Sequence, residues 1–194
     1  DYCNDNFETE IPVSAPPNKY VDIYDSYKNR LLNYFKEYDG NENEVVFSEN
    51  EISYDIQLTK NKSIKFHGFI DLLLKDKDGN LIIQDYKSKS DFKNDNEYKE
   101  YLRQLLLYAE GVYALYNQYP KFLSFDMFKI GKKYKSKFKK SDLVEAIKWV
   151  KNTIKKIYDE TEFPTMCDNP QNDFFCRYVC GYGCDVCMQT KGLT

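Results

Sequence analysis

The sequence predicts an α/β domain followed by a small cysteine-rich segment. Segments with apolar residues at helical spacing flank a group of strand-like segments, and an Asp-Gly turn signal joins two of those strands. Five of the six cysteines fall in the last 28 residues. At 194 residues the chain can form one substantial core but not two ordinary domains. We therefore expect one domain over residues 1–166 and an accessory subdomain over residues 167–194.

Three segments have the spacing of amphipathic helices, namely residues 20–38, 97–116 and 141–158. Asp39-Gly40 ends the first of them, and Ser141 or Asp142 can cap the third. Residues 1–19 contain three prolines and no clear period, so we expect an irregular arm there.

Four segments are expected to be strands, namely residues 45–58, 64–74, 81–87 and 122–130. The turn at residues 76–80 contains Asp78-Gly79, so the second and third strands should form an antiparallel hairpin. The expected order of elements is α-β-β-β-α-β-α.

The third strand is apolar and then ends in charged residues. Side chains of a strand point alternately to opposite faces, so Asp85 and Lys87 continue a row of apolar side chains. A buried charge is costly unless it is paired or bound to a metal. The segment therefore indicates a ligand site, unless the strand simply leaves the core and becomes solvated.

Asp71 is a second acid within an otherwise apolar strand. If the hairpin closes at Asp78-Gly79, Asp71 and Asp85 lie at similar distances from the turn, so both carboxylates can approach one cation. Mg²⁺ commonly takes one or two protein carboxylates together with water and substrate phosphate. Lys87 could then orient or deprotonate a water for in-line attack on a phosphodiester.

Three sequence motifs resemble those of RecB-like nucleases in the PD-(D/E)XK superfamily. They are Gly68-Phe69-Ile70-Asp71, Asp85-Tyr86-Lys87 and Gln104-Leu105-Leu106-Leu107-Tyr108, which resemble the family's G-x-x-D, D-Y-K and Q-x-x-x-Y motifs. The resemblance covers most of residues 20–130. It implies a mixed sheet flanked by helices, with the core order α-β-β-β-α-β, and an Mg²⁺- or Mn²⁺-dependent deoxyribonuclease.

The resemblance also implies a role for five residues. Asp71 and Asp85 are expected to bind the metal, Lys87 to act on the water, and Gln104 and Tyr108 to hold the active site or the DNA. Independently of the family, residues four apart on a helix share one face, so Gln104 and Tyr108 can point together.

The chain differs from its relatives at the first helix, where they usually carry a histidine or an acid as a further metal ligand. The only histidine here is His67, on the second strand, and we expect it to be structural. Near Tyr24 to Lys28, Asp25 is the only plausible ligand, although a surface position is the plainer interpretation.

Residues 129–140 hold seven lysines and no acid, in a chain of net charge −3. We expect a loop there, either solvated or in contact with phosphates, because clustered lysines attract nucleic acid through counterion release. In the second case the contacts would come from Lys132, Lys133, Lys135 and Lys137.

The cysteine-rich end favours a metal site over disulfides, because no secretory signal is evident. Zinc takes four ligands, which Cys176, Cys180, Cys184 and Cys187 could supply. An iron–sulfur cluster is also held by cysteine thiolates. The residues alone leave both open.

A subset of RecB-like nucleases, including AddB-type helicase-nuclease subunits and CRISPR-adaptation exonucleases, holds a [4Fe–4S] cluster with one cysteine before the core and three after it. By resemblance, the expected ligands are Cys3, Cys176, Cys180 and Cys187, with Cys167 and Cys184 as alternates. Such a cluster would hold the two ends of the chain together and would not be a redox catalyst.

These features predict a metal-dependent DNA nuclease. The resemblance implies an exonuclease acting on single-stranded DNA or DNA ends in recombination, repair or replication. The alternative is a nuclease-fold module that binds DNA or a partner without cutting, within a complex that could include a helicase or recombination protein.

Composition also bears on where the protein acts. No apolar run reaches the roughly 20 residues that span a bilayer, so we expect a cytoplasmic protein without membrane contact. The Asn-, Lys-, Tyr- and Ile-rich composition fits an AT-rich genome, such as that of a bacteriophage or a low-GC bacterium.

Overall fold

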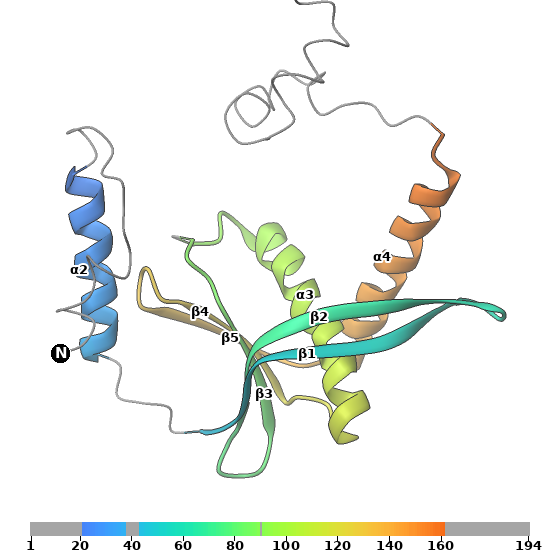
Figure 1. The fold of residues 1–194 in the computed structure, drawn as a ribbon, viewed down its shortest axis with the longest axis horizontal. Coiled ribbons are helices and arrows are strands. Elements are labelled where there is room, and N and C mark those ends of the chain that lie inside the picture. The colour runs from blue at the N-terminus through green and yellow to red at the C-terminus, as the bar shows by residue number, and fades with distance from the viewer. Residues whose placement is uncertain (1–20, 38–42, 90, 162–194) are drawn as a thin grey trace, which may run out of the picture. The chain divides into compact units, whose positions relative to one another are not determined.

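The computed structural model describes residues 21–37, 43–89 and 91–161, with side chains from residue 28 onward (Figure 1). Its elements are α2 (Val21–Glu37), β1 (Glu44–Thr59), β2 (Lys62–Lys75), β3 (Leu81–Tyr86), α3 (Asp95–Tyr116), β4 (Phe122–Met127), β5 (Lys132–Lys137) and α4 (Lys140–Asp159). The predicted domain boundary at residues 166 and 167 and all six cysteines lie outside the described residues.

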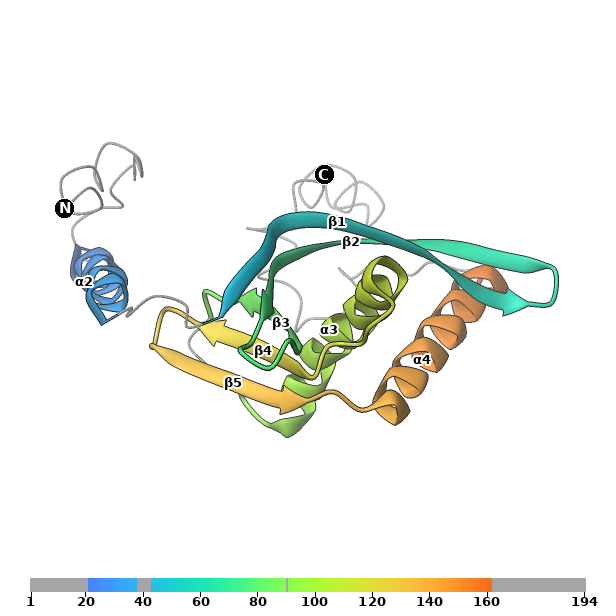
Figure 2. The same cartoon turned by 90° about the horizontal axis from the view of Figure 1, so that it is seen from below.

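The strands form one mixed sheet in the order β1-β2-β3-β4-β5 (Figure 2). The β1–β2, β2–β3 and β4–β5 pairs are antiparallel, whereas β3 and β4 are parallel. Parallel neighbours need a crossover connection, and α3 supplies it between β3 and β4. The predicted fold class, an α/β core with a mixed sheet and flanking helices, is confirmed.

The hairpin between β2 and β3 closes where the sequence predicts. The backbone N–H groups of Asp78 and Asn80 both donate to Asp76 Oδ1, at 3.0 and 2.8 Å. Gly79 has a φ of 81°, a conformation that glycine adopts without steric cost. The register that follows pairs Leu72 with Gln84 and Leu73 with Ile83.

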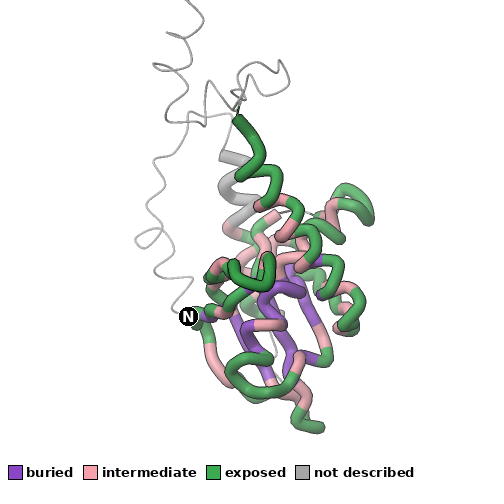
Figure 3. Tube along the Cα trace, turned by 90° about the vertical axis from the view of Figure 1, so that its right-hand side faces the viewer, coloured by how far each residue is buried: buried purple, intermediate pink, exposed green. Residues whose placement is uncertain are grey.

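The main core lies between α3 and the sheet. Figure 3 shows that the buried segments lie together in the interior of the described part of the chain. The fully buried side chains include Leu105, Ala109 and Val112 of α3 together with Leu73, Ile83, Leu123 and Phe125 of the sheet. Leu143 and Ala146 of α4 join the same cluster. Packing of this kind fixes α3 against the carboxyl end of β3, where the charged residues lie.

The prediction of a lysine-rich loop is wrong, because the middle of that segment, Lys132–Lys137, is strand β5. The predicted fourth strand ends at Met127, and a turn with Ile130 N bonded to Met127 O at 2.9 Å returns the chain along β4. Tyr134 and Ser136 are partly buried while the intervening lysines are exposed. This alternation of period two is typical of a strand at the surface, and the high lysine content obscures it in the sequence.

None of the described helices is both long and apolar enough to cross a membrane.

Candidate active site

Asp71 and Asp85 lie at the same level of neighbouring strands. The register that pairs Leu72 with Gln84, continued by one residue, places Asp71 opposite Asp85. The backbone N–H of Tyr86 donates to Asp71 Oδ2 at 2.8 Å, which ties the first carboxylate to the strand that carries the second. The hairpin therefore brings the two acids together at the carboxyl end of β3.

Asp85 is a buried carboxylate, with 4% of its surface exposed. Its Oδ2 atom lies 2.7 Å from Lys87 Nζ, and within the described part of the chain this oxygen accepts no other hydrogen bond. Burial raises the pKa of Asp85, and so does the charge of Asp71, while Lys87 opposes the rise. The net effect is a raised pKa, as expected for a carboxyl group taken out of water.

Lys87 connects Asp85 to α3 through a chain of polar contacts. Lys87 Nζ donates to Gln104 Oε1 at 3.4 Å, and Gln104 Nε2 donates to the hydroxyl of Tyr108 at 2.8 Å. The backbone N–H of Lys87 donates to Asp126 O of β4 at 2.9 Å. Both ends of the lysine are thus held, and the ammonium group lies between a strand carboxylate and a helix amide.

Gly68 leaves room for Tyr108, the last residue in this series of polar contacts, to lie against the sheet. A Cβ atom at this position would lie 2.6 Å from Cε1 of Tyr108, too close for any real contact. Tyr108 is 7% exposed and is packed against β2. The glycine of the first motif and the tyrosine of the third are therefore complementary in shape.

A known protein family matches nearly the whole chain. The family profile of the PD-(D/E)XK nuclease superfamily matches residues 4–187. The chain belongs to this superfamily. No curated protein matches the chain. The crystal structure of SSO0001 is similar at 18% sequence identity, covering 94% of this chain and 79% of that chain, with a TM-score of 0.43.

Members of the PD-(D/E)XK superfamily typically use Mg²⁺ or Mn²⁺, and the donors present here fit such an ion. Asp71 and Asp85 offer hard oxygen atoms on adjacent strands, and a cation would offset the cost of keeping Asp85 ionised. The described residues contain no group of three or more His, Cys, Asp or Glu side chains that could hold a metal. Water or substrate oxygens are the usual further ligands of Mg²⁺ at a site with two protein carboxylates.

The other two ligand candidates can be placed only in part. Asp25 lies in α2, in the portion whose side chains the structure does not describe. His67 lies on the exposed part of the β1–β2 hairpin, with Nδ1 3.0 Å from Glu51 Oε1. It has an acid partner of its own, which agrees with a structural role.

Three residues that surround Lys87 were not predicted from the sequence. The ammonium group lies 5.4 Å from the centre of the Tyr101 ring and 5.9 Å from that of Phe125, and Asp126 holds the lysine backbone. Tyr101 precedes Gln104 by three residues on α3 and so shares its face, a signal that was available in the sequence. Phe125 and Asp126 reach the site only through the parallel pairing of β3 with β4.

The four lysines of the expected DNA contact lie on β5. Lys132 Nζ is 3.2 Å from Asp91 Oδ2, and Lys133 Nζ is 3.5 Å from Asp126 Oδ2. Lys135 lies 4.1 Å above the ring of Phe122, and Lys137 is exposed. Two of the four thus have acidic partners, and their contact with DNA stays a prediction.

Proposed function

We propose that this PD-(D/E)XK superfamily member is a RecB-like deoxyribonuclease that hydrolyses DNA with Mg²⁺ or Mn²⁺. We further propose that it acts as an exonuclease on single-stranded DNA or DNA ends, in recombination, repair or replication. The observation that carries the proposal is the polar chain from Asp85 through Lys87 and Gln104 to Tyr108, with Asp71 beside its first member.

Asp71 and Asp85 would hold the cation. A bound divalent ion supplies Lewis-acid stabilisation of the scissile phosphate and makes a nearby water easier to deprotonate. The amide of Tyr86 orients Asp71, and Lys87 opposes the rise that burial causes in the pKa of Asp85. The site thus holds its oxygen donors in place before substrate arrives, which is the arrangement that electrostatic catalysis requires.

Lys87 would act on the water or the phosphate. An ammonium group has three donors, and two of the hydrogens of Lys87 are directed at Asp85 and Gln104. The third can donate to a phosphate oxygen or orient the attacking water. Gln104 fixes the ammonium position because its own amide is held by Tyr108.

Cleavage by closely matched lysine variants tests this role. Lys87→Ala should lower kcat about 100-fold on end-labelled linear DNA, because one charge-stabilising donor is lost. Lys89→Ala is the matched control, since Lys89 lies two residues on and pairs with Glu97 at 2.7 Å. It should stay within about threefold of the parent protein, and equal activity of the two variants would contradict the assignment of Lys87.

The form of the substrate tests the remainder of the proposal. Exonuclease action predicts that linear DNA is degraded in Mg²⁺ while a covalently closed circle is not, and that EDTA stops the reaction. Equal cleavage of circles would show an endonuclease. Tight binding without any cleavage would favour the non-catalytic module instead.

The cysteines would hold a structural [4Fe–4S] cluster, with Cys3, Cys176, Cys180 and Cys187 as ligands and Cys167 and Cys184 as alternates. Only the sequence pattern supports this part, because these residues are outside the described ranges. Iron and sulfide analysis of anaerobically purified protein should find about four of each per chain. One zinc per chain and no iron would replace the cluster with a zinc site.

A helicase or another recombination protein is the expected partner. Co-purification of such a protein with the full chain from its host would support this, and recovery of the chain alone would contradict it.

A further inference from the structure

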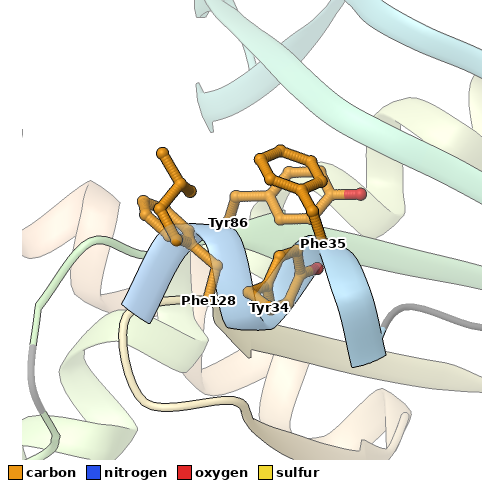
Figure 4. Close-up of a pocket in the computed structure, with 5 residues that line it drawn as sticks. Tyr34, Phe35, Tyr86 and Phe128 are labelled. Atoms are coloured by element: carbon orange, nitrogen blue, oxygen red, sulfur yellow. The ribbon is translucent and has the colours of Figure 1, made fainter. Parts of the chain in front are cut away.

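An aromatic pocket lies beside Tyr86, the middle residue of the motif that carries Asp85 and Lys87. Figure 4 shows Tyr34 and Phe35 of α2 close to Tyr86 and Phe128. Together with Leu31 these residues line a pocket of about 440 Å³. That volume is in the range of small-ligand sites. The lining of the pocket is almost entirely apolar.

The pocket is at the same edge of the sheet as the two acids. Tyr86 is the last residue of β3, and Phe128 follows the last residue of β4. Because these strands are parallel, their carboxyl ends meet at one edge. Tyr86 points to the opposite face from Asp85, so a bound strand that crosses this edge can reach the acids on one side and the pocket on the other.

The rings of the pocket are held in place and are partly exposed. Tyr34 donates its hydroxyl to Asp126 Oδ2 at 3.0 Å, and its ring meets those of Phe35 and Phe128 edge-on at 5.7 and 6.3 Å. Phe35 is 50% exposed and Tyr86 is 38% exposed. Aromatic rings that are fixed and partly exposed are suited to stacking a planar ligand.

A basic pocket adjoins the aromatic one. It has a volume of about 330 Å³, shares Tyr34 and Phe128 with the first, and adds Arg30, Asn33 and Lys129 to the lining. An apolar slot for a planar group next to a cationic slot matches a nucleotide, which has an aromatic base and a phosphate. Single-strand binding sites combine these two elements, stacking on aromatic rings and attraction of the backbone by positive charge.

We propose that the aromatic pocket takes one unpaired base of the DNA substrate and that the basic pocket takes a phosphate next to it. This inference rests on the proposed nuclease function and deepens it, because it assigns a substrate position. A paired base would have to leave its helix to enter, so the pocket selects single-stranded ends or ends that fray readily. Binding in it would set the register of the strand across Asp71 and Asp85.

Base-by-base probing of the bound strand tests the proposal. The full chain carrying Asp85→Asn would be mixed with single-stranded oligonucleotides that carry 2-aminopurine at successive positions from the end. One position should change its fluorescence on binding, because its base enters the pocket. Removing that base as an abasic site should weaken binding about 5- to 100-fold, the range for one stacked base.

Variants of the pocket then show whether Phe35 contacts that base. With Phe35→Leu added, the fluorescence change should be lost, and the abasic site should no longer weaken binding. Phe35→Tyr should keep both effects. Leu115→Ala is the matched control, since Leu115 is an exposed apolar residue of α3, and it should behave like the parent. An abasic effect of the same size with and without Phe35→Leu would overturn the proposal.

The salt dependence of DNA affinity tests separately whether the basic pocket binds a phosphate. Arg30→Gln should reduce the slope of log affinity against log salt by about one, equally for intact and abasic oligonucleotides. An unchanged slope would overturn the assignment of the basic pocket. If the parent chain cleaves single-stranded DNA but no position responds to 2-aminopurine, the pocket proposal fails alone. If the chain neither binds nor cleaves DNA, the proposed function fails with it.

Discussion

Asp85 and Asp126 are two buried carboxylates at the carboxyl ends of neighbouring parallel strands, and their surroundings differ. Asp85 lies opposite Asp71 and is paired with Lys87, on the face covered by α3. Asp126 points to the other face, where it is completely buried, accepts the hydroxyl of Tyr34 and has Lys133 3.5 Å away. Asp126 Oδ1 accepts no hydrogen bond from any described residue, whereas Asp85 Oδ2 has the ammonium group of Lys87 beside it.

The difference teaches that burial of an acid does not by itself identify a catalytic group. What distinguishes the Asp85 side is a second carboxylate at the same level and a lysine that is itself fixed from α3. Asp126 contributes to that side only through its backbone, which accepts the N–H of Lys87. The side of Asp85 is therefore suited to holding a cation. The side of Asp126 is suited to linking α2 and β5 to the end of β4.

Matched substitutions at the two acids should give the largest effect. Asp85→Asn should lower kcat/KM for DNA at least about 1000-fold in Mg²⁺, because a charged oxygen donor of the cation site is lost. Asp126→Asn should lower it less than about tenfold, because the carbonyl that holds Lys87 remains. Single-turnover cleavage measures kcat/KM for both variants. Similar decreases would contradict a functional difference between the two acids.

Adding a methyl group at Gly68 should disturb the site around Asp85, although Gly68 does not contact Asp85 itself. Gly68→Ala places an atom against Tyr108, so it should lower the free energy of unfolding by about 1–3 kcal/mol. It should also reduce activity, because Tyr108 can no longer hold Gln104. Urea denaturation measures the first effect and cleavage the second. Ser63→Ala, at an exposed position of the same strand, is the control and should change neither.

The pH dependence of stability should show the charge on Asp85. Its pKa is raised in the folded protein by burial, so the folded state binds this proton more tightly than the unfolded chain. Ionised Asp85 therefore lowers the free energy of unfolding above its folded-state pKa. That penalty shrinks as the pH falls through this pKa and is gone below the unfolded value of about 3.9.

Asp85→Asn has no such proton to lose. The free energy of unfolding of the variant minus that of the parent should therefore increase as the pH rises from about 4 and then level off. Urea denaturation in EDTA at a series of pH values measures it. A difference that stays constant with pH would contradict the raised pKa. Cleavage by the parent in Mg²⁺ should also fall at low pH, because protonated Asp85 offers the cation no charged oxygen.

The smallest expected effect is on the Asp126 side. Tyr34→Phe removes the hydroxyl that donates to Asp126 Oδ2, and the free energy of unfolding should fall by about 1 kcal/mol, the usual value of one hydrogen bond. Lys133 remains as a partner of the acid, which limits the loss. Denaturant titration of the full chain measures it, and a gain in stability would show that the bond does not contribute.

Local patterns made the Asp85 side predictable from the sequence. Asp78-Gly79 fixes the hairpin, and its register alone is sufficient to place Asp71 opposite Asp85. Gln104 and Tyr108 follow from helical spacing. The order of the elements was predicted except for β5. This strand was missed because its alternation is between lysine and small or aromatic residues rather than between polar and apolar ones.

The Asp126 side was not predictable in the same way. Asp126 lies in an apolar segment without a motif around it, and its partner Tyr34 is 92 residues away. The aromatic pocket likewise forms only when α2 packs near the ends of two strands, so no short segment contains its pattern. Contacts of this kind depend on tertiary packing, and the spacing of residues along the sequence does not predict them.

The lysines of β5 have a consequence for self-association. Among the described strands, β5 is the last of the sheet and pairs on one side only, with β4. The open edge of a sheet offers backbone groups that can pair with a strand of another molecule, and lysine side chains along such an edge oppose that pairing. Lys133, Lys135 and Lys137 are all exposed there. Replacing them with threonine would keep the strand but remove this protection, and the protein should then aggregate at lower concentration.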